Sequence, residues 1–140
     1  MIMSSQKSIP ERFKVRIGGF LGPSYSIRMK ENELIYRVNE NEDDYKELVV
    51  TPSEERWQNF KQALDDIGVW QWNEEYPNPG DTDGTQWFLE IEWDGRTIKS
   101  YGDDNYPTTD GTPENNPELS PTFENFLEAV RKLIGGLKFR

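Results

Sequence analysis

The 140-residue sequence contains neither histidine nor cysteine. It therefore has no imidazole general base, no thiol nucleophile, no disulfide and no Cys/His zinc site. These absences exclude most hydrolase and redox mechanisms and leave carboxylate, hydroxyl, lysine and backbone chemistry. We predict a non-enzymatic protein with no cofactor and no bound metal ion.

Long apolar runs are missing as well. No stretch approaches the roughly 18 consecutive apolar residues of a membrane span, and residues 1–8 lack the apolar run of a signal peptide. We therefore expect no contact with membranes and a cytoplasmic protein. The length is typical of one domain, and we predict a single domain over residues 1–140 with residues 1–10 as a disordered tail.

Hydrophobic residues make up only 34% of the chain, whereas aromatic residues reach 13%. One large ring buries about 150–250 Å², so a few rings supply the apolar area that aliphatic residues do not. We therefore predict a core rich in aromatic side chains.

The charge is strongly acidic and unevenly distributed. The chain carries 26 acidic and 16 basic residues, and residues 72–118 alone hold 12 acidic and 2 basic ones. An acidic surface repels phosphate backbones and attracts cationic partners. We expect a basic protein partner and no nucleic acid. The sequence gives no indication of the oligomeric state.

Alternating apolar residues predict strands over residues 13–17, 25–30 and 34–38. An acidic loop is expected over residues 39–44, and a short extended piece over residues 47–50.

Two amphipathic helices follow from capping signals and apolar spacing. For the first, Thr51 as N-cap with Pro52 and Glu54 predicts the start, and Gly68 predicts the end. For the second, Ser120-Pro121 predicts the start and a Gly-Gly pair at residues 135–136 the end.

The clearest hairpin signal is Asp94-Gly95, a type I′ turn after an alternating run from Trp87 to Trp93. This turn sets a register with three cross-strand pairs. They are a ring–cation pair of Trp93 with Arg96, a β-branched pair of Ile91 with Ile98 and an ion pair of Glu90 with Lys99.

The order of these elements predicts a two-layer α+β fold in the order β-β-β-α-β-β-α. A mainly antiparallel sheet of about five strands would carry two helices on one face. Residues 102–118 are polar and rich in proline, and we predict a long loop there.

The sequence also contains Gly68-Val69-Trp70-Gln71-Trp72, Tyr76, Asp83-Gly84-Thr85-Gln86-Trp87, Gly95-Arg96, Gly102 and Tyr106-Pro107. In this respect the chain resembles a group of small bacterial proteins that share the pattern GVWxW…Y…DGTxW…GR…G…YP over roughly residues 15–135. No activity is established for that group. The resemblance therefore implies a fold and transfers no site residue.

Aromatic and acidic residues gather directly after the first predicted helix. Trp70 and Trp72 are two positions apart, so in an extended segment their rings point the same way, beside Glu74, Glu75 and Tyr76. Such rings stack on a sugar or hold a cationic side chain. Alternatively, one or both tryptophans close the core.

Oxygen ligands suited to calcium occur at residues 78–83 and 103–105. However, a calcium loop with Gly84 at its glycine position places Pro79 at the first ligand position and takes Glu90 from a predicted strand. We therefore interpret Asp83-Gly84 as a turn.

These observations favour an acidic interaction module that binds a basic protein, as an inhibitor or immunity-type protein would. Two alternatives stay open: a carbohydrate-binding module with Trp72, Tyr76 and Tyr106 as stacking rings, and a weak carboxylate hydrolase. The expected acidic surface includes Asp81 and Asp83. The candidate binding residues are Trp72, Glu74, Glu75, Tyr76, Asp103, Asp104 and Tyr106.

Overall fold

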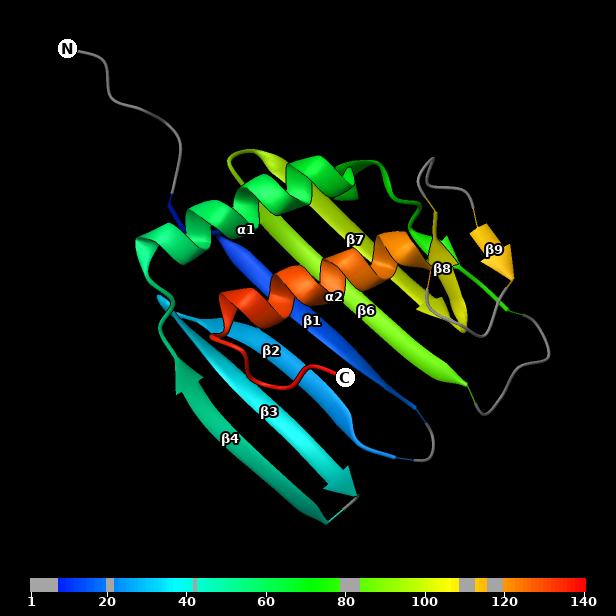
Figure 1. Cartoon of the computed structure of the whole chain (residues 1–140), viewed down its shortest axis with the longest axis horizontal. Helices are drawn as coiled ribbons and strands as arrows, with labels where there is room; N and C mark the ends of the chain where they lie inside the picture. Colours follow the sequence, from blue (N-terminus) through cyan, green and yellow to red (C-terminus); the bar gives the residue numbers. More distant parts are fainter. Residues whose placement is uncertain (1–7, 20–21, 42, 79–83, 109–112, 116–119) are drawn as a thin grey trace.

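The computed structural model describes residues 8–19, 22–41, 43–78, 84–108, 113–115 and 120–140. Seven strands form one sheet in the order β4-β3-β2-β1-β6-β7-β5, and two helices cover one of its faces (Figure 1). The sheet strands are β1 (Arg12–Gly19), β2 (Ser24–Lys30), β3 (Glu33–Asn41), β4 (Asp44–Val50), β5 (Glu75–Tyr76), β6 (Thr85–Trp93) and β7 (Arg96–Asp103). The helices are α1 (Glu54–Ile67) and α2 (Pro121–Leu133), with a short 3-10 helix η1 (Val69–Gln71).

The two-layer α+β architecture is confirmed, but the sheet has seven strands instead of about five. All its pairings are antiparallel except that of β5 with β7. The predicted short piece at residues 47–50 is part of the full strand β4, and most of the predicted loop at residues 39–44 is strand. The side chains of β4 are almost entirely exposed, so the strand has no alternation of apolar and polar residues from which it could be predicted.

Helix α1 begins two residues later than predicted. The Ser53 hydroxyl accepts a hydrogen bond from the Arg56 amide at 3.2 Å, and the Ser53 carbonyl accepts one from the Trp57 amide at 3.0 Å. Ser53, not Thr51, is therefore the N-cap. The predicted end is confirmed, because Gly68 adopts a left-handed conformation with φ 78°.

Helix α2 begins as predicted, with the Ser120 hydroxyl accepting from the Phe123 amide at 3.1 Å. It ends at Leu133, with Ile134 as the C-cap directly before the two glycines. Arg131 and Lys132 lie in its last turn, where the helix dipole favours cations.

The β6–β7 hairpin has the predicted register. Asp94 and Gly95 both have positive φ, and all three expected cross-strand pairs are present as backbone partners. The predicted ring–cation contact is wrong, however. Trp93 faces the helix layer and is fully buried, so Lys61 of α1 lies over its ring and Arg96 reaches Trp70 instead.

An aromatic network fills the space between the sheet and the helices, as the composition predicts. Near the middle of the sheet, rings from β1, β6 and α1 form one cluster, in which Trp57 meets both Phe13 and Trp93 edge to face. The cluster consists of Phe13, Trp57, Phe60 and Trp93. Beneath α2 a second group contains Trp72, Tyr76, Trp87, Tyr106, Phe123 and Phe126. Aromatic pairs contribute about 0.5–1.5 kcal/mol beyond the area that they bury.

The predicted loop at residues 102–118 is partly regular. Its first two residues complete β7, and β8 (Asn105–Pro107) pairs with β9 (Pro113–Asn115) in a small antiparallel ribbon. Asn105 is buried, and its amide donates to the Pro77 carbonyl at 2.8 Å. Buried hydrogen bonds of this kind are the reason that polar residues here do not form an open loop.

At the N-terminus, residues 1–7 of the predicted tail lie outside the described residues. Pro10 is buried and Ile9 packs against the core, so the last part of that segment belongs to the domain. In the described part of the chain, neither helix has the length and hydrophobicity that crossing a bilayer requires.

Candidate functional site

The face of the sheet opposite the helices, which we call the open face, carries a row of four side chains that crosses four strands. Arg16 of β1 lies opposite Phe88 of β6, Phe88 lies opposite Tyr101 of β7, and Tyr101 lies opposite Glu75 of β5. We call these four residues the cross-sheet row. It places a cation at one end, a carboxylate at the other and two rings between them.

A pocket of about 660 Å³ opens along the cross-sheet row, within the range of about 300–1,000 Å³ typical of ligand sites. Asn78, Gln86 and Asp103 contribute further polar groups to its wall. We call it the open-face pocket. It brings together three of the predicted site residues, Glu75, Tyr76 and Asp103. The rings of Phe88 and Tyr101, which were not among the predicted binding residues, lie beside them.

A hydrogen bond fixes the acidic end of the pocket. The Tyr101 hydroxyl donates to Glu75 Oε1 at 2.5 Å, and the Tyr101 amide donates to the Glu74 carbonyl at 2.9 Å. The bond to the carboxylate raises the pKa of the Tyr101 phenol above its ordinary value. Glu74 and Glu75 are both exposed, so their carboxylates are available to a ligand in water.

The segment that presents Glu75 is held on the sheet by side chains of its neighbours. Ser100 Oγ donates to the Asn73 carbonyl at 2.6 Å, and the Asn73 amide donates to the Tyr76 hydroxyl at 2.9 Å. These contacts, with the Asn105–Pro77 bond, determine where the two-residue strand β5 lies. The acidic end is therefore built on a defined backbone.

The adjacent acids Asp103 and Asp104 have different roles. Asp103 is half-buried and lines the open-face pocket. Asp104 is buried, and its carboxylate accepts from the Thr85 amide at 2.9 Å while its own amide donates to the Thr85 carbonyl at 2.8 Å. The prediction of Asp104 as a surface binding residue is wrong, because its carboxylate closes the end of the β6–β7 ladder. Asp81 and Asp83 lie outside the described residues.

The three predicted stacking rings are in the core. Trp72 is 6% exposed, Tyr76 0% and Tyr106 1%, so none offers an open face to a sugar or a cation. Trp72 also does not share a direction with Trp70, because η1 replaces the extended segment that we expected. On the opposite face of the sheet, the half-buried Phe88 ring and the exposed Tyr101 ring occupy the polar positions in the alternation of β6 and β7.

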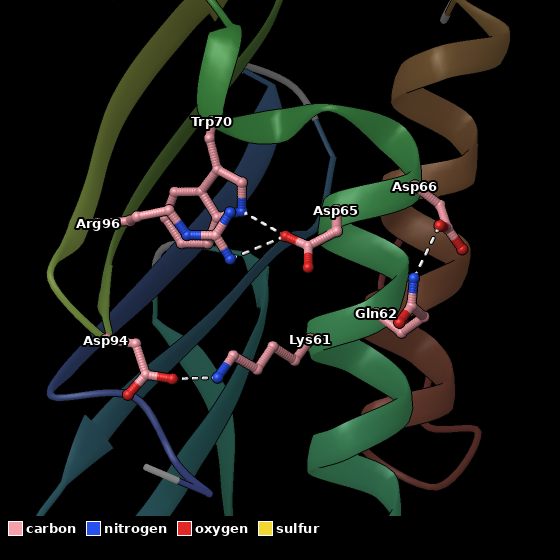
Figure 2. Close-up of polar contacts among 7 residues, drawn as sticks. All are labelled: Lys61, Gln62, Asp65, Asp66, Trp70, Asp94 and Arg96. Carbon is pink, nitrogen blue, oxygen red and sulfur yellow. Dashed lines mark hydrogen bonds and ion pairs between the residues drawn. The ribbon is translucent and has the colours of Figure 1, made fainter. Parts of the chain in front are cut away.

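Trp70 belongs to a structural contact at the edge of the helix layer, which Figure 2 shows. The Arg96 guanidinium lies 4.5 Å from the Trp70 ring centroid. Asp65 accepts from both Trp70 Nε1 at 3.0 Å and Arg96 at 2.9 Å. With the ion pair of Lys61 and Asp94, these contacts join α1 to the β6–β7 hairpin. The ring face of Trp70 is thus already occupied by the chain's own arginine.

A second pocket of about 620 Å³ lies between the two helices. Its charged residues come from both helices and have both signs, with Arg56, Asp66, Glu128 and Lys132 among them. It contains none of the predicted site residues. Within the part of the chain that the structure describes, no group of three acidic side chains is arranged to hold a metal ion.

No protein-family model matches the chain, and no curated protein matches it significantly. The resemblance to small bacterial proteins therefore stays a prediction, and functional arguments rest on the open face itself.

Tyr106 provides a test of the burial of this region. Its hydroxyl makes no hydrogen bond of good geometry with the described residues, and burial raises the pKa of the phenol to about 12. The unfolded phenol ionises near pH 10, whereas the folded one does not ionise until about pH 12, so the fold loses stability as the pH rises from 10 toward 12.

We expect Tyr106→Phe to keep or slightly raise the stability at pH 7, within about 1 kcal/mol, since it removes an unpaired buried hydroxyl and leaves the ring. The variant should also lose less stability than the wild type between pH 10 and 12. Urea unfolding at pH 7 and pH 11 measures both effects. A marked destabilisation at pH 7 would show that the hydroxyl has a partner.

Proposed function

We propose that this protein is a non-enzymatic binding module that captures a basic segment of a protein partner in the open-face pocket. One observation carries the proposal: the exposed Tyr101 ring and the half-buried Phe88 ring lie beside the carboxylates of Glu75 and Asp103 in one pocket. An inhibitor or immunity-type protein is the class of module that we favour.

Rings next to carboxylates suit an arginine or lysine side chain. A cation over an aromatic face gains about 0.5–1 kcal/mol at exposed sites, and a carboxylate adds a charge-assisted hydrogen bond. Lys14 Nζ already lies 5.7 Å from the centre of the Phe88 ring, so the Tyr101 ring beside Glu75 is the ring offered to a partner's cation. The net charge of −10 would also speed the approach of a basic partner.

The polarity of the cross-sheet row gives the bound segment a direction. A cationic side chain is favoured at the Glu75 end and disfavoured near Arg16. Because the rings separate the two ends, a basic side chain at the acidic end avoids Arg16. This arrangement favours partners with isolated basic residues over partners with unbroken basic runs.

The test uses a peptide of four Arg-Gly repeats as the probe and calorimetry as the measurement. We expect binding that weakens several-fold between about 50 and 200 mM salt, because exposed charges are screened within roughly a Debye length. Glu75→Gln should weaken binding further at low salt, since it removes one charge and leaves the side-chain size unchanged.

Glu54→Gln is the matched control, since Glu54 is an exposed carboxylate in the first turn of α1, away from the pocket. It should bind the peptide as the wild type does. If Glu75→Gln and Glu54→Gln lost equal affinity for the peptide, only the net charge would attract the peptide, and the proposal of a binding pocket would be wrong. Binding that does not respond to salt would favour recognition by stacking alone.

A further inference from the structure

The two central strands of this acidic protein carry no acidic residue. Strands β1 and β2 together contain five cations, and all five side chains are exposed. The alternation of burial in β1 and the register of β1 with β2 place them on the open face. They are Arg12, Lys14, Arg16, Arg28 and Lys30.

The arrangement of these cations is unfavourable for the fold. Lys14 lies directly opposite Arg28, and like charges directly opposite each other destabilise an antiparallel pair. On its other side Arg28 faces Ile35 of β3. Arg16 faces Ser26 on one side and Phe88 on the other. Neither arginine therefore has an acid directly opposite it in the sheet.

These five cations form a strip along β1 and β2. On the side of the strip next to β6 their charge is compensated, and on the β2 side it is not. Arg12 forms an ion pair of 3.7 Å with Glu90, which also lies opposite Lys14. Lys14 leans over the Phe88 ring. In contrast, Arg16 and Arg28 form no ion pair or side-chain hydrogen bond with any residue that the structure describes. The uncompensated positive charge thus lies between β1 and β2.

Four residues with hydrogen-bond donors are neighbours in the register of β1 and β2 at that place. Arg16 and Ser26 are cross-strand partners, and Lys14 and Arg28 are the next pair on the same face. Diagonal neighbours on one face are about 7–8 Å apart, which two guanidinium groups span easily. Guanidinium forks bind tetrahedral oxyanions with two hydrogen bonds each.

We propose that Lys14, Arg16, Ser26 and Arg28 form a binding site for the phosphate group of a small ligand. A doubly charged phosphate offsets the repulsion of three cations better than a single carboxylate does. Glu90 and Glu92 on β6 adjoin the strip and disfavour a long polyanion. The site goes beyond the proposed function, since its ligand has the opposite charge to the basic partner.

Binding is measured by amide chemical shifts during a titration with sodium phosphate at pH 7, against sodium chloride at the same ionic strength. We expect shifts in β1 and β2 that chloride does not produce. Arg28→Gln should raise the dissociation constant for phosphate about tenfold or more, whereas Lys46→Gln, an exposed cation on β4, should not change it. Phosphate should also raise the midpoint of thermal unfolding of the wild type.

A second measurement separates a ligand site from a structural role. Without phosphate, Arg28→Gln should unfold at the same temperature as the wild type or above it, because it removes a repulsive pair. Phenyl phosphate distinguishes the two possible ligand sources. If phenyl phosphate binds more tightly than inorganic phosphate, the ligand has a ring that lies beside Phe88. If the two bind equally, the site recognises the phosphate group alone. Equal shifts in phosphate and chloride, or phosphate binding that Arg28→Gln leaves intact, would overturn the proposal.

Discussion

Replacing Trp72 with alanine is expected to lower the free energy of unfolding by about 3–5 kcal/mol, the usual cost of removing a large buried ring. Trp72 is 6% exposed and contacts Trp87, Phe123 and Phe126, with ring centroids 5.4–6.0 Å apart. The substitution removes a ring that joins η1, β6 and α2. Urea unfolding followed by circular dichroism measures the effect.

Trp70→Ala is the matched control two positions away. Trp70 is half-buried, and it contacts Arg96 and Asp65 at the surface. We expect a loss clearly smaller than that of Trp72→Ala, because one ring–cation contact and one exposed hydrogen bond contribute little. If the two variants lost equal stability, or if Trp72→Ala cost less, the placement of Trp72 in the core would be wrong.

Gly102→Ala is expected to cost about 2–4 kcal/mol, because it combines overpacking with the loss of a buried hydrogen bond. A Cβ at position 102 would lie 2.4 Å from Trp87 Nε1 and 2.6 Å from the Asn105 carbonyl oxygen. These two atoms form a hydrogen bond of 3.0 Å. The added methyl group would therefore force the donor and the acceptor apart.

Thr97→Ala serves as the control in the same strand, since Thr97 is exposed and such substitutions change stability by about 0.5 kcal/mol or less. The Trp87 indole proton provides a local probe, and its resonance should move in Gly102→Ala and stay in Thr97→Ala. Wild-type stability in Gly102→Ala, with an unchanged indole resonance, would contradict the close approach of β7, Trp87 and β8.

Local sequence signals predicted the elements that bury one face. The alternation in residues 13–17 and 87–93 and the spacing of Trp57, Phe60 and Leu64 each reflect contact with the same core. The Asp94-Gly95 turn fixed the register of the β6–β7 hairpin because both residues adopt positive φ. The same signals are absent from β4, whose side chains face water on both sides, and from β5, which has only two residues.

The candidate site was predicted in part. The predicted binding residues Glu74 and Glu75 are exposed, and Asp103 lines the pocket, whereas the adjacent Asp104 is buried. The choice of rings was wrong, since Trp72, Tyr76 and Tyr106 are all buried. Trp72 and Tyr106 pack on Phe123 of α2, and Tyr76 packs on Trp87 of β6, and local sequence patterns do not reveal these tertiary contacts. Phe88 and Tyr101 stand at positions where the alternation of β6 and β7 would place polar side chains. Aromatic residues at such positions were the signal in the sequence that could have identified these rings.

The most direct test of the account is a map of amide chemical-shift changes during titration with the Arg-Gly peptide at low salt. We expect changes in β6, β7 and the 74–78 segment around Phe88, Tyr101 and Glu75, and no comparable changes in the groove between α1 and α2. Changes confined to the helices, or spread evenly over every acidic residue, would contradict the assignment of the open face as the binding surface.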